Sequence, residues 1–226
     1  MSGVRNAFNC SFVACRSNLR KVLFFSIFRL ISNFVLKISF QCWHFILCYK
    51  PQLLSTNNQY QVLCLGLSGS GKSTLLAQLV GEQTNNIEPT NGFNIKTLPL
   101  NGIILSVKEL GGSERLQTFW SNYYENKHAL LFIVNIASNE LLMKQSLDTL
   151  RQILMNPDLR GRPLMIIGTH KDRPEARTQQ QIEQYFQPLL NDHNKCKILC
   201  CSAFDRNSIM DAFAALIVLI KNVFPS

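Results

Sequence analysis

Residues 66–74 read Gly-Leu-Ser-Gly-Ser-Gly-Lys-Ser-Thr, which fits the phosphate-loop pattern of a glycine, four residues and then Gly-Lys-Ser/Thr. Glycines let successive backbone N–H groups turn toward a polyphosphate at the positive end of a helix dipole. Lys72 adds a mobile cation, and Ser73 offers its hydroxyl to a Mg²⁺ ion that bridges the terminal phosphates. The stretch therefore predicts a nucleotide site made by these residues: Gly66, Ser68, Gly69, Ser70, Gly71, Lys72, Ser73 and Thr74.

Two elements must position this loop. The apolar run at 60–65 predicts a buried strand before it, and residues 73–80 predict the first turns of a helix after it. A flexible Gly/Ser-rich linker is the alternative, but linkers rarely lie between a buried strand and an amphipathic helix. The pattern is stronger evidence for nucleotide binding than for hydrolysis.

The remaining sequence alternates strand patterns with helix patterns. Strands are expected at 93–100, 103–109, 129–136, 163–168 and 197–201, and helices near 141–154, 179–190 and 208–223. Asn101-Gly102 predicts a tight two-residue hairpin. The expected fold class is α/β, with a mostly parallel sheet, one antiparallel hairpin strand and helices on both faces.

Ligand sites in parallel sheets lie at the carboxyl ends of the strands. Besides the phosphate loop, three stretches fall there: Gly111-Gly112, residues 169–172 and Ser202-Ala203. We expect all of them to face one nucleotide pocket. Asp172 can accept two N–H bonds from guanine, whereas adenine lacks the matching donors. A helix cap is its alternative role, because Arg173-Pro174 follow.

The net charge of +9 is concentrated near the N-terminus. Residues 1–60 hold seven Lys or Arg and no Asp or Glu, whereas residues 61–226 hold sixteen Lys or Arg and fourteen Asp or Glu. Positive charge confined to an apolar segment favours an anionic membrane surface over nucleic acid. We therefore predict membrane lipid, and no nucleic acid, as a partner.

Residues 19–49 are dominated by Leu, Ile, Val, Phe and Trp, yet Arg29 and Lys37 interrupt every window long enough for a clean membrane span. Polar residues recur every three or four positions, which favours an amphipathic helix that lies in the membrane interface. A signal anchor and a contact with another protein are the alternatives.

The eight cysteines show no Cys-x-x-Cys pair and no histidine spacing typical of zinc sites, so reduced cytosolic thiols are expected. Four cysteines lie in the basic extension and could accept palmitate, although plain thiols fit equally well: Cys10, Cys15, Cys42 and Cys48. The expected location is the cytoplasmic face of an intracellular or plasma membrane, with a soluble cytosolic pool.

The order of these stretches resembles the small GTPases, and among them the ADP-ribosylation-factor family, over roughly residues 58–222. Residues 89–93, Pro-Thr-Asn-Gly-Phe, look like the first switch of that family. The resemblance implies a P-loop NTPase fold that binds GTP or GDP with Mg²⁺. Together with the basic, apolar N-terminal stretch and the polar, proline-containing residues 51–59, it leads us to expect a membrane-associating extension at 1–50, a hinge at 51–59 and a GTP-binding domain at 60–226.

The resemblance also assigns roles to single residues. Lys72 and the loop amides would hold the phosphates, and Gly112 would sense the terminal phosphate. The hydroxyls of Ser73 and Thr90 would bind Mg²⁺, and Asp172 would read the guanine edge. Nucleotide contacts are further expected from Thr169, His170, Ser202 and Ala203.

Several positions depart from the family pattern. Thr169-His170 replaces the usual Asn-Lys of the base motif, which weakens the expected guanine specificity. Glu109 replaces an Asp and is one methylene longer, but would still accept a hydrogen bond from a Mg²⁺-bound water. Ser113 replaces the Gln that orients the attacking water and is too short to do so. Slow intrinsic hydrolysis is therefore expected.

Lys108 replaces an aromatic residue of the family, while Phe93 and Tyr123 remain, so an altered effector surface is expected there. The leading hypothesis is a monomeric, membrane-associated GTP-binding switch that recruits protein partners in trafficking or signalling. A nucleotide-stabilised scaffold that does not cycle is the alternative, which Ser113 favours. A P-loop kinase or ATPase is disfavoured, because neither an acceptor-substrate lid nor an acidic pair after an apolar strand is evident.

Overall fold

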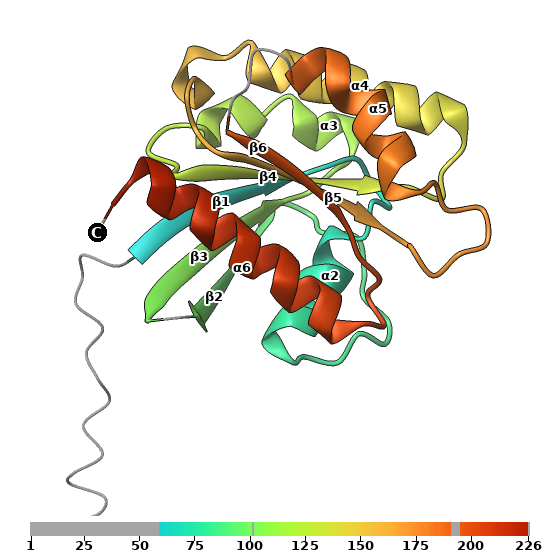
Figure 1. The fold of residues 1–226 in the computed structure, drawn as a ribbon, viewed down its shortest axis with the longest axis horizontal. Coiled ribbons are helices and arrows are strands. Elements are labelled where there is room, and N and C mark those ends of the chain that lie inside the picture. The colour runs from blue at the N-terminus through green and yellow to red at the C-terminus, as the bar shows by residue number, and fades with distance from the viewer. Residues whose placement is uncertain (1–58, 101, 191–194, 226) are drawn as a thin grey trace, which may run out of the picture. The chain divides into compact units, whose positions relative to one another are not determined.

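The computed structural model describes residues 59–100, 102–190 and 195–225, and their strands form one six-stranded sheet (Figure 1). Across the sheet the order is β2-β3-β1-β4-β5-β6. The pair β2–β3 is antiparallel and the other neighbouring pairs are parallel, so the expected mostly parallel α/β sheet with one hairpin strand is confirmed. The strands are β1 (Gln59–Leu65), β2 (Phe93–Leu100), β3 (Ile103–Leu110), β4 (Ala129–Asn135), β5 (Leu164–Thr169) and β6 (Cys196–Cys200).

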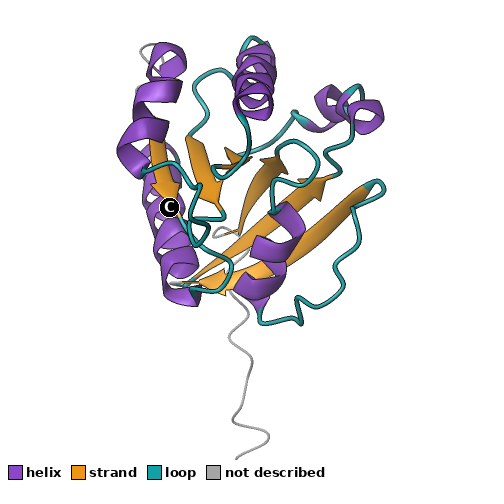
Figure 2. Ribbon diagram, turned by 90° about the vertical axis from the view of Figure 1, so that its right-hand side faces the viewer, coloured by secondary structure: helices purple, strands orange, loops and turns teal. Residues whose placement is uncertain are grey.

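Helices cover both faces of this sheet (Figure 2). The long ones follow the expected patterns within about two residues. The short elements α3, η2 and η3 were not expected, because a single turn has no periodicity that a sequence can display. The bounds are α2 (Lys72–Val80), α3 (Glu114–Gln117), η2 (Trp120–Tyr123), α4 (Glu140–Leu154), η3 (Pro157–Leu159), α5 (Gln179–Leu190) and α6 (Arg206–Val223).

Strand β1 illustrates how the core is divided into two layers. Successive side chains of a strand point to opposite faces of the sheet. Val62 and Cys64 pack with residues of α2 and α6, whereas Leu63 and Leu65 pack with residues of α4 and α5. All four are fully buried, which explains why β1 needs a continuous apolar run rather than an alternating one.

The hairpin between β2 and β3 closes as the sequence predicts. Leu100 pairs with Ile103, which leaves a two-residue connection. Gly102 has a φ of 77°, a left-handed value that glycine adopts at little cost, while Asn101 lies outside the described residues. Strand β2 is an edge strand; it contains Pro99 and pairs its Lys96 with the carboxylate of Glu82.

The predicted membrane-associating extension at 1–50 and almost all of the hinge, up to residue 58, lie outside the described residues. Within the described ranges, no helix is both long enough and apolar enough to cross a bilayer. The interfacial helix at 19–49 and the acylation of its cysteines stay predictions.

At the edge of the sheet where β1 begins, His128 connects this strand to the end of α6. Its Nδ1 accepts a hydrogen bond from the Gln61 N–H at 2.9 Å. Its ring meets the rings of Tyr60 and Phe224 edge-on, with centroids 5.4 and 5.2 Å away. Burial first, and then the cation of Arg162, hold the pKa of His128 below its ordinary value, so the ring is neutral at neutral pH.

Acidification should therefore destabilise the fold through His128. The unfolded chain takes up the proton first, near the ordinary value of 6.5. The stabilising contribution is present above that pH and is lost as the pH falls through the lowered pKa of the folded state. In urea unfolding at about pH 7.5 and about pH 5.5, the free energy of unfolding should fall less for His128→Gln than for the wild type. An equal fall in both proteins would contradict this role of His128.

Candidate nucleotide-binding site

A cavity of about 490 Å³ opens at the carboxyl edge of the sheet, where the loops after β1 and β3 meet. It brings together residues that are far apart in the sequence. The expected ones are Ser68, Gly69, Gly71, Lys72, Ser73, Thr74, Thr90, Glu109, Gly112 and His170, and the lining is completed by Ile87, Glu88, Pro89, Asn91, Ser113 and Leu116.

The phosphate loop contains glycine at two positions where a larger residue would be strained. Gly69 and Gly71 have left-handed φ values of 71° and 84°. A Cβ on Gly71 would also lie 3.2 Å from the His170 ring and 3.3 Å from the Thr169 hydroxyl. Gly71 precedes α2 without a side-chain cap, so the free N–H groups of the first helical turn are available to an anion.

The side chain of Lys72 is buried inside its own loop. Its Nζ donates to the carbonyl oxygens of Gly66 at 2.8 Å and Leu67 at 2.9 Å, and lies 3.5 Å from the Ser70 hydroxyl. Burial lowers the pKa of Lys72 from its ordinary value of 10.5, and the nearby carboxylate of Glu109 opposes that shift. The loop thus fixes one cation beside the cavity.

The backbone at Gly112 lies directly against the phosphate loop. Its carbonyl oxygen accepts from the Ser68 N–H at 3.0 Å and from the Gln117 side chain at 2.9 Å. A Cβ on Gly112 would come within 2.4 Å of the Gly66 carbonyl oxygen. The bare backbone that the sequence predicts at this second loop is therefore required by packing.

Three side-chain oxygens converge at the wall of the cavity. The hydroxyls of Ser73 and Thr90 lie 3.0 Å apart, and both donate to Oε1 of Glu109, Thr90 at 3.3 Å. Glu109 is only 1% exposed, and its other oxygen, Oε2, has no hydrogen-bond partner among the described residues. A buried carboxylate beside two hydroxyls is a donor set that suits a hard divalent cation such as Mg²⁺.

The loop after β5 is attached to the phosphate loop through Thr169. The Thr169 hydroxyl donates to the Ser70 carbonyl oxygen at 2.7 Å and lies 2.9 Å from Nδ1 of His170. His170 itself has a left-handed φ of 63°, which is uncommon for a residue with a side chain. Burial, followed by the charge of Arg173, lowers the pKa of His170, so a neutral imidazole lines the cavity.

Asp172 and Ser202, which follow two neighbouring strands, are hydrogen-bonded to each other. Oδ1 of Asp172 accepts from the Ser202 hydroxyl at 2.6 Å, and this hydrogen bond is the main cause that lowers the pKa of Asp172. The same hydroxyl accepts from the Phe204 N–H at 3.1 Å. Six expected residues do not line this cavity: Gly66, Ser70, Thr169, Asp172, Ser202 and Ala203. The expectation that all four stretches face one pocket is therefore not met by Ser202-Ala203, and of residues 169–172 only His170 lines the cavity.

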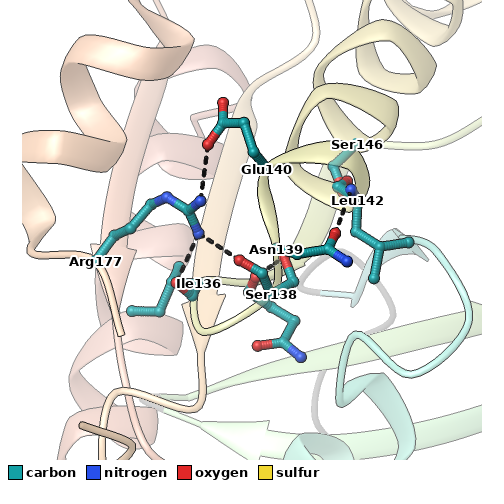
Figure 3. A network of polar contacts seen from close by, with 8 residues as sticks. Ile136, Ser138, Asn139, Glu140, Leu142, Ser146 and Arg177 are labelled. Atoms are coloured by element: carbon teal, nitrogen blue, oxygen red, sulfur yellow. Dashed lines mark hydrogen bonds and ion pairs between the residues drawn. The ribbon is translucent and has the colours of Figure 1, made fainter. Parts of the chain in front are cut away.

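Arg177, at the end of the loop after β5, hydrogen-bonds to the loop after β4 (Figure 3). Its guanidinium donates to the carbonyl oxygens of Ser138 at 2.6 Å and Ile136 at 3.2 Å, and to Oε2 of Glu140 at 2.9 Å. Asn139 caps α4 beside this network by accepting from the Leu142 N–H at 3.0 Å. Nothing in the sequence distinguishes Arg177 from an ordinary solvated cation.

Sequence reasoning also missed three lining residues. Ile87 and Glu88 lie in a loop without secondary structure, and Leu116 lies on the one-turn helix α3. Neither segment is periodic, so no pattern points to them.

The predicted effector residues Phe93, Lys108 and Tyr123 lie together, and Ile95 adjoins them. We call these four residues the aromatic patch. The Lys108 ammonium lies 5.0 Å from the centre of the Phe93 ring and 5.1 Å from that of Tyr123, within cation–π range. Ile95 faces Lys108 across the β2–β3 pair. Phe93 and Ile95 are 50% and 52% exposed, so half of their surface faces solvent.

Comparisons with known proteins agree with this geometry. Residues 47–220 match the model of the ADP-ribosylation factor family. Human ADP-ribosylation factor-like protein 15 is 34% identical over 192 residues, which cover 84% of this chain and 93% of that protein. ADP-ribosylation factor-like protein 3 of Caenorhabditis elegans is 31% identical over 157 residues, which cover 69% and 85%.

A solved structure shares the fold. The Arl6 BBS3 small GTPase of Trypanosoma brucei, solved with the bound nucleotide analogue GppNp, superposes with a TM-score of 0.65 at 22% identity. The match covers 73% of this chain and 98% of that one. The expected small-GTPase fold is therefore confirmed by structure, and the expected family by sequence. The chain belongs to the ADP-ribosylation factor family of small GTPases.

Proposed function

We propose that this small GTPase is a slowly hydrolysing switch that binds GTP with Mg²⁺ and acts at a membrane. The observation that carries the proposal is the convergence of Ser73, Thr90 and Glu109 beside the buried Lys72. These residues come from the phosphate loop, from the loop before β2 and from the end of β3. A ligand that joins them would order both loops at once, which is how a nucleotide-dependent switch works.

Each part of the site has a distinct task in this proposal. The amides of the phosphate loop and Lys72 hold the phosphates, and the hydroxyls of Ser73 and Thr90 hold Mg²⁺. When bound, Mg²⁺ offsets the mutual repulsion of the phosphate oxygens. The Gly112 backbone, packed on the phosphate loop, is the contact for the terminal phosphate.

Guanine selection is assigned to Asp172. The hydrogen bond from Ser202 keeps the carboxylate ionised and oriented, so it can accept from two guanine N–H groups. The Thr169 hydroxyl donates to the phosphate loop, so it is not free to contact the base. His170 presents a neutral ring where the family has the long aliphatic side chain of a lysine. We therefore propose a guanine preference below that of a complete base motif.

Slow hydrolysis follows from Ser113. Its carbonyl oxygen accepts from the Leu116 and Gln117 N–H groups of α3, and the side chain at this cavity-lining position is only a short hydroxymethyl group. Such a side chain cannot orient water as a glutamine does. The same observation favours the second candidate function, a nucleotide-stabilised scaffold that does not cycle.

The remaining parts of the proposal concern partners and location. Residues 19–49 would lie in the membrane interface as an amphipathic helix, and a protein partner would bind the aromatic patch. The support is the amphipathic sequence pattern for the first and the exposure of Phe93 and Ile95 for the second. A monomer on the cytoplasmic face of a membrane, with a soluble pool, fits both.

Removal of the phosphate cation or disturbance of the metal ligand should weaken nucleotide binding. We expect Lys72→Ala and Ser73→Asn to raise the Kd of GTP with Mg²⁺ at least about tenfold, since one charge-assisted hydrogen bond is worth about 1.5–3 kcal/mol. Isothermal titration of the purified proteins measures this. Lys144→Ala, which removes an exposed lysine of α4, is the matched control and should bind like the wild type. Unchanged affinity in both site variants would remove the phosphate-loop assignment.

The base preference should depend on Asp172. We expect Asp172→Ala to bring the affinity for GTP close to that for ATP, because the carboxylate supplies the discriminating hydrogen bonds. Competition of each nucleotide against a fluorescent GDP analogue measures the ratio. Asp158→Ala, an exposed carboxylate on η3, should keep the wild-type ratio. If the wild type already binds ATP as tightly as GTP, the guanine assignment is wrong.

A longer amide at position 113 should restore part of the hydrolysis rate. We expect Ser113→Gln to raise single-turnover GTP hydrolysis about tenfold or more, where a fully positioned catalytic group contributes about a hundredfold or more. Ser113→Ala should hydrolyse at the wild-type rate, because the serine hydroxyl is not used. A rate for Ser113→Gln equal to that of the wild type, with GTP binding intact, would contradict the catalytic defect.

A further inference from the structure

We propose that the carboxylate of Glu109 binds Mg²⁺ directly, where a shorter aspartate would act through a metal-bound water. This inference rests on the proposed function and names a role for one residue within that site. Through its longer side chain, Glu109 brings a carboxylate oxygen beside the hydroxyls of Ser73 and Thr90 at the cavity wall.

The first argument is the spacing of the three oxygens. Adjacent ligands of an octahedral Mg²⁺ lie about 3 Å apart, because each is about 2.1 Å from the ion. The Ser73 and Thr90 hydroxyls are 3.0 Å apart, and Oε1 of Glu109 is 3.3 Å from the Thr90 hydroxyl. Oε1 also accepts from Ser73, so it lies next to both proposed ligands. The two separations that involve the Thr90 hydroxyl therefore match the edges of a Mg²⁺ coordination octahedron, and the hydrogen bond from Ser73 places Oε1 beside the second proposed ligand.

The second argument is the incomplete set of partners around the buried Glu109 carboxylate. Glu109 is 1% exposed and its Oε2 has no hydrogen-bond partner in the described part of the chain. Lys72 is the nearby cation, but its ammonium donates to the carbonyl oxygens of Gly66 and Leu67. Cys64, opposite Glu109 in the sheet, is fully buried and offers no positive charge to the carboxylate. A carboxylate in this position needs a cation.

The third argument is reach. The pairing of Glu109 with Cys64 on β1 and with Asn94 on β2 holds its backbone inside the sheet. The distance that the carboxylate covers is then decided by the length of the side chain. One extra methylene adds about 1.5 Å, more than half the length of a Mg²⁺–oxygen bond, which lets the oxygen replace a water.

The full-length protein with a non-hydrolysable GTP analogue and Mn²⁺ tests the proposal. Mn²⁺ substitutes for Mg²⁺, and the broadening of its electron paramagnetic resonance lines in ¹⁷O-labelled water counts the bound waters. Ser73, Thr90, two phosphate oxygens and Glu109 would occupy five positions and leave one water. We expect one water in the wild type and two in Glu109→Asp. Two waters in the wild type would overturn the proposal, and this measurement needs no variant to fold.

The dependence of nucleotide release on free Mg²⁺ gives a second readout. We expect the Mg²⁺ concentration that half-maximally retains a fluorescent GDP analogue to be at least about tenfold higher in Glu109→Asp and Glu109→Gln than in the wild type, because loss of even an outer-shell partner typically weakens metal binding by that factor. Glu114→Asp, on the exposed side of α3, is the matched control. Equal midpoints in the wild type and Glu109→Asp would overturn the direct contact. A wild type that retains no nucleotide at any Mg²⁺ concentration would instead remove the proposed function itself.

Discussion

The buried ammonium of Lys72 is the interaction on which the site depends. A cation out of water is tolerated where oxygens surround it, and here the chain supplies the carbonyl groups of Gly66 and Leu67. With those carbonyls directed inward at the lysine and with left-handed turns at Gly69 and Gly71, the loop is held in one tight conformation. Without the lysine, the two inward carbonyl groups would lose this hydrogen-bond donor, and the tight conformation of the loop would be destabilised.

Other loops are fastened to that shape from outside. Gly112 accepts from Ser68, and Thr169 donates to the Ser70 carbonyl oxygen, so the loops after β3 and β5 are both anchored on the backbone of the phosphate loop. The parallel strands bring these loops to one edge, but the hydrogen bonds fix their distance. Phosphate, metal and base contacts are thus positioned by the same few backbone atoms.

The sequence was informative where a requirement falls on one residue type or on a regular spacing. The glycines of residues 66–71, the turn at Asn101-Gly102 and the buried run of β1 all predicted their structures. It was uninformative where a side chain acts through tertiary contacts. Arg177 looks like a surface cation, and the hydrogen bonds of Glu109 depend on how β3 lies beside β1. The guanine and hydrolysis assignments stay predictions, because they concern ligands rather than the fold.

Strand β2 has a consequence for the behaviour of the protein at high concentration. The outer edge of a sheet offers unpaired backbone groups on which another copy could add a strand, the first step of β-aggregation. In β2 that edge includes Pro99, which has no N–H to donate, and the charged side chain of Lys96. Both features make edge-to-edge stacking unfavourable. Although β2 exposes the apolar side chains of Phe93 and Ile95, Pro99 and Lys96 in the same strand therefore oppose aggregation.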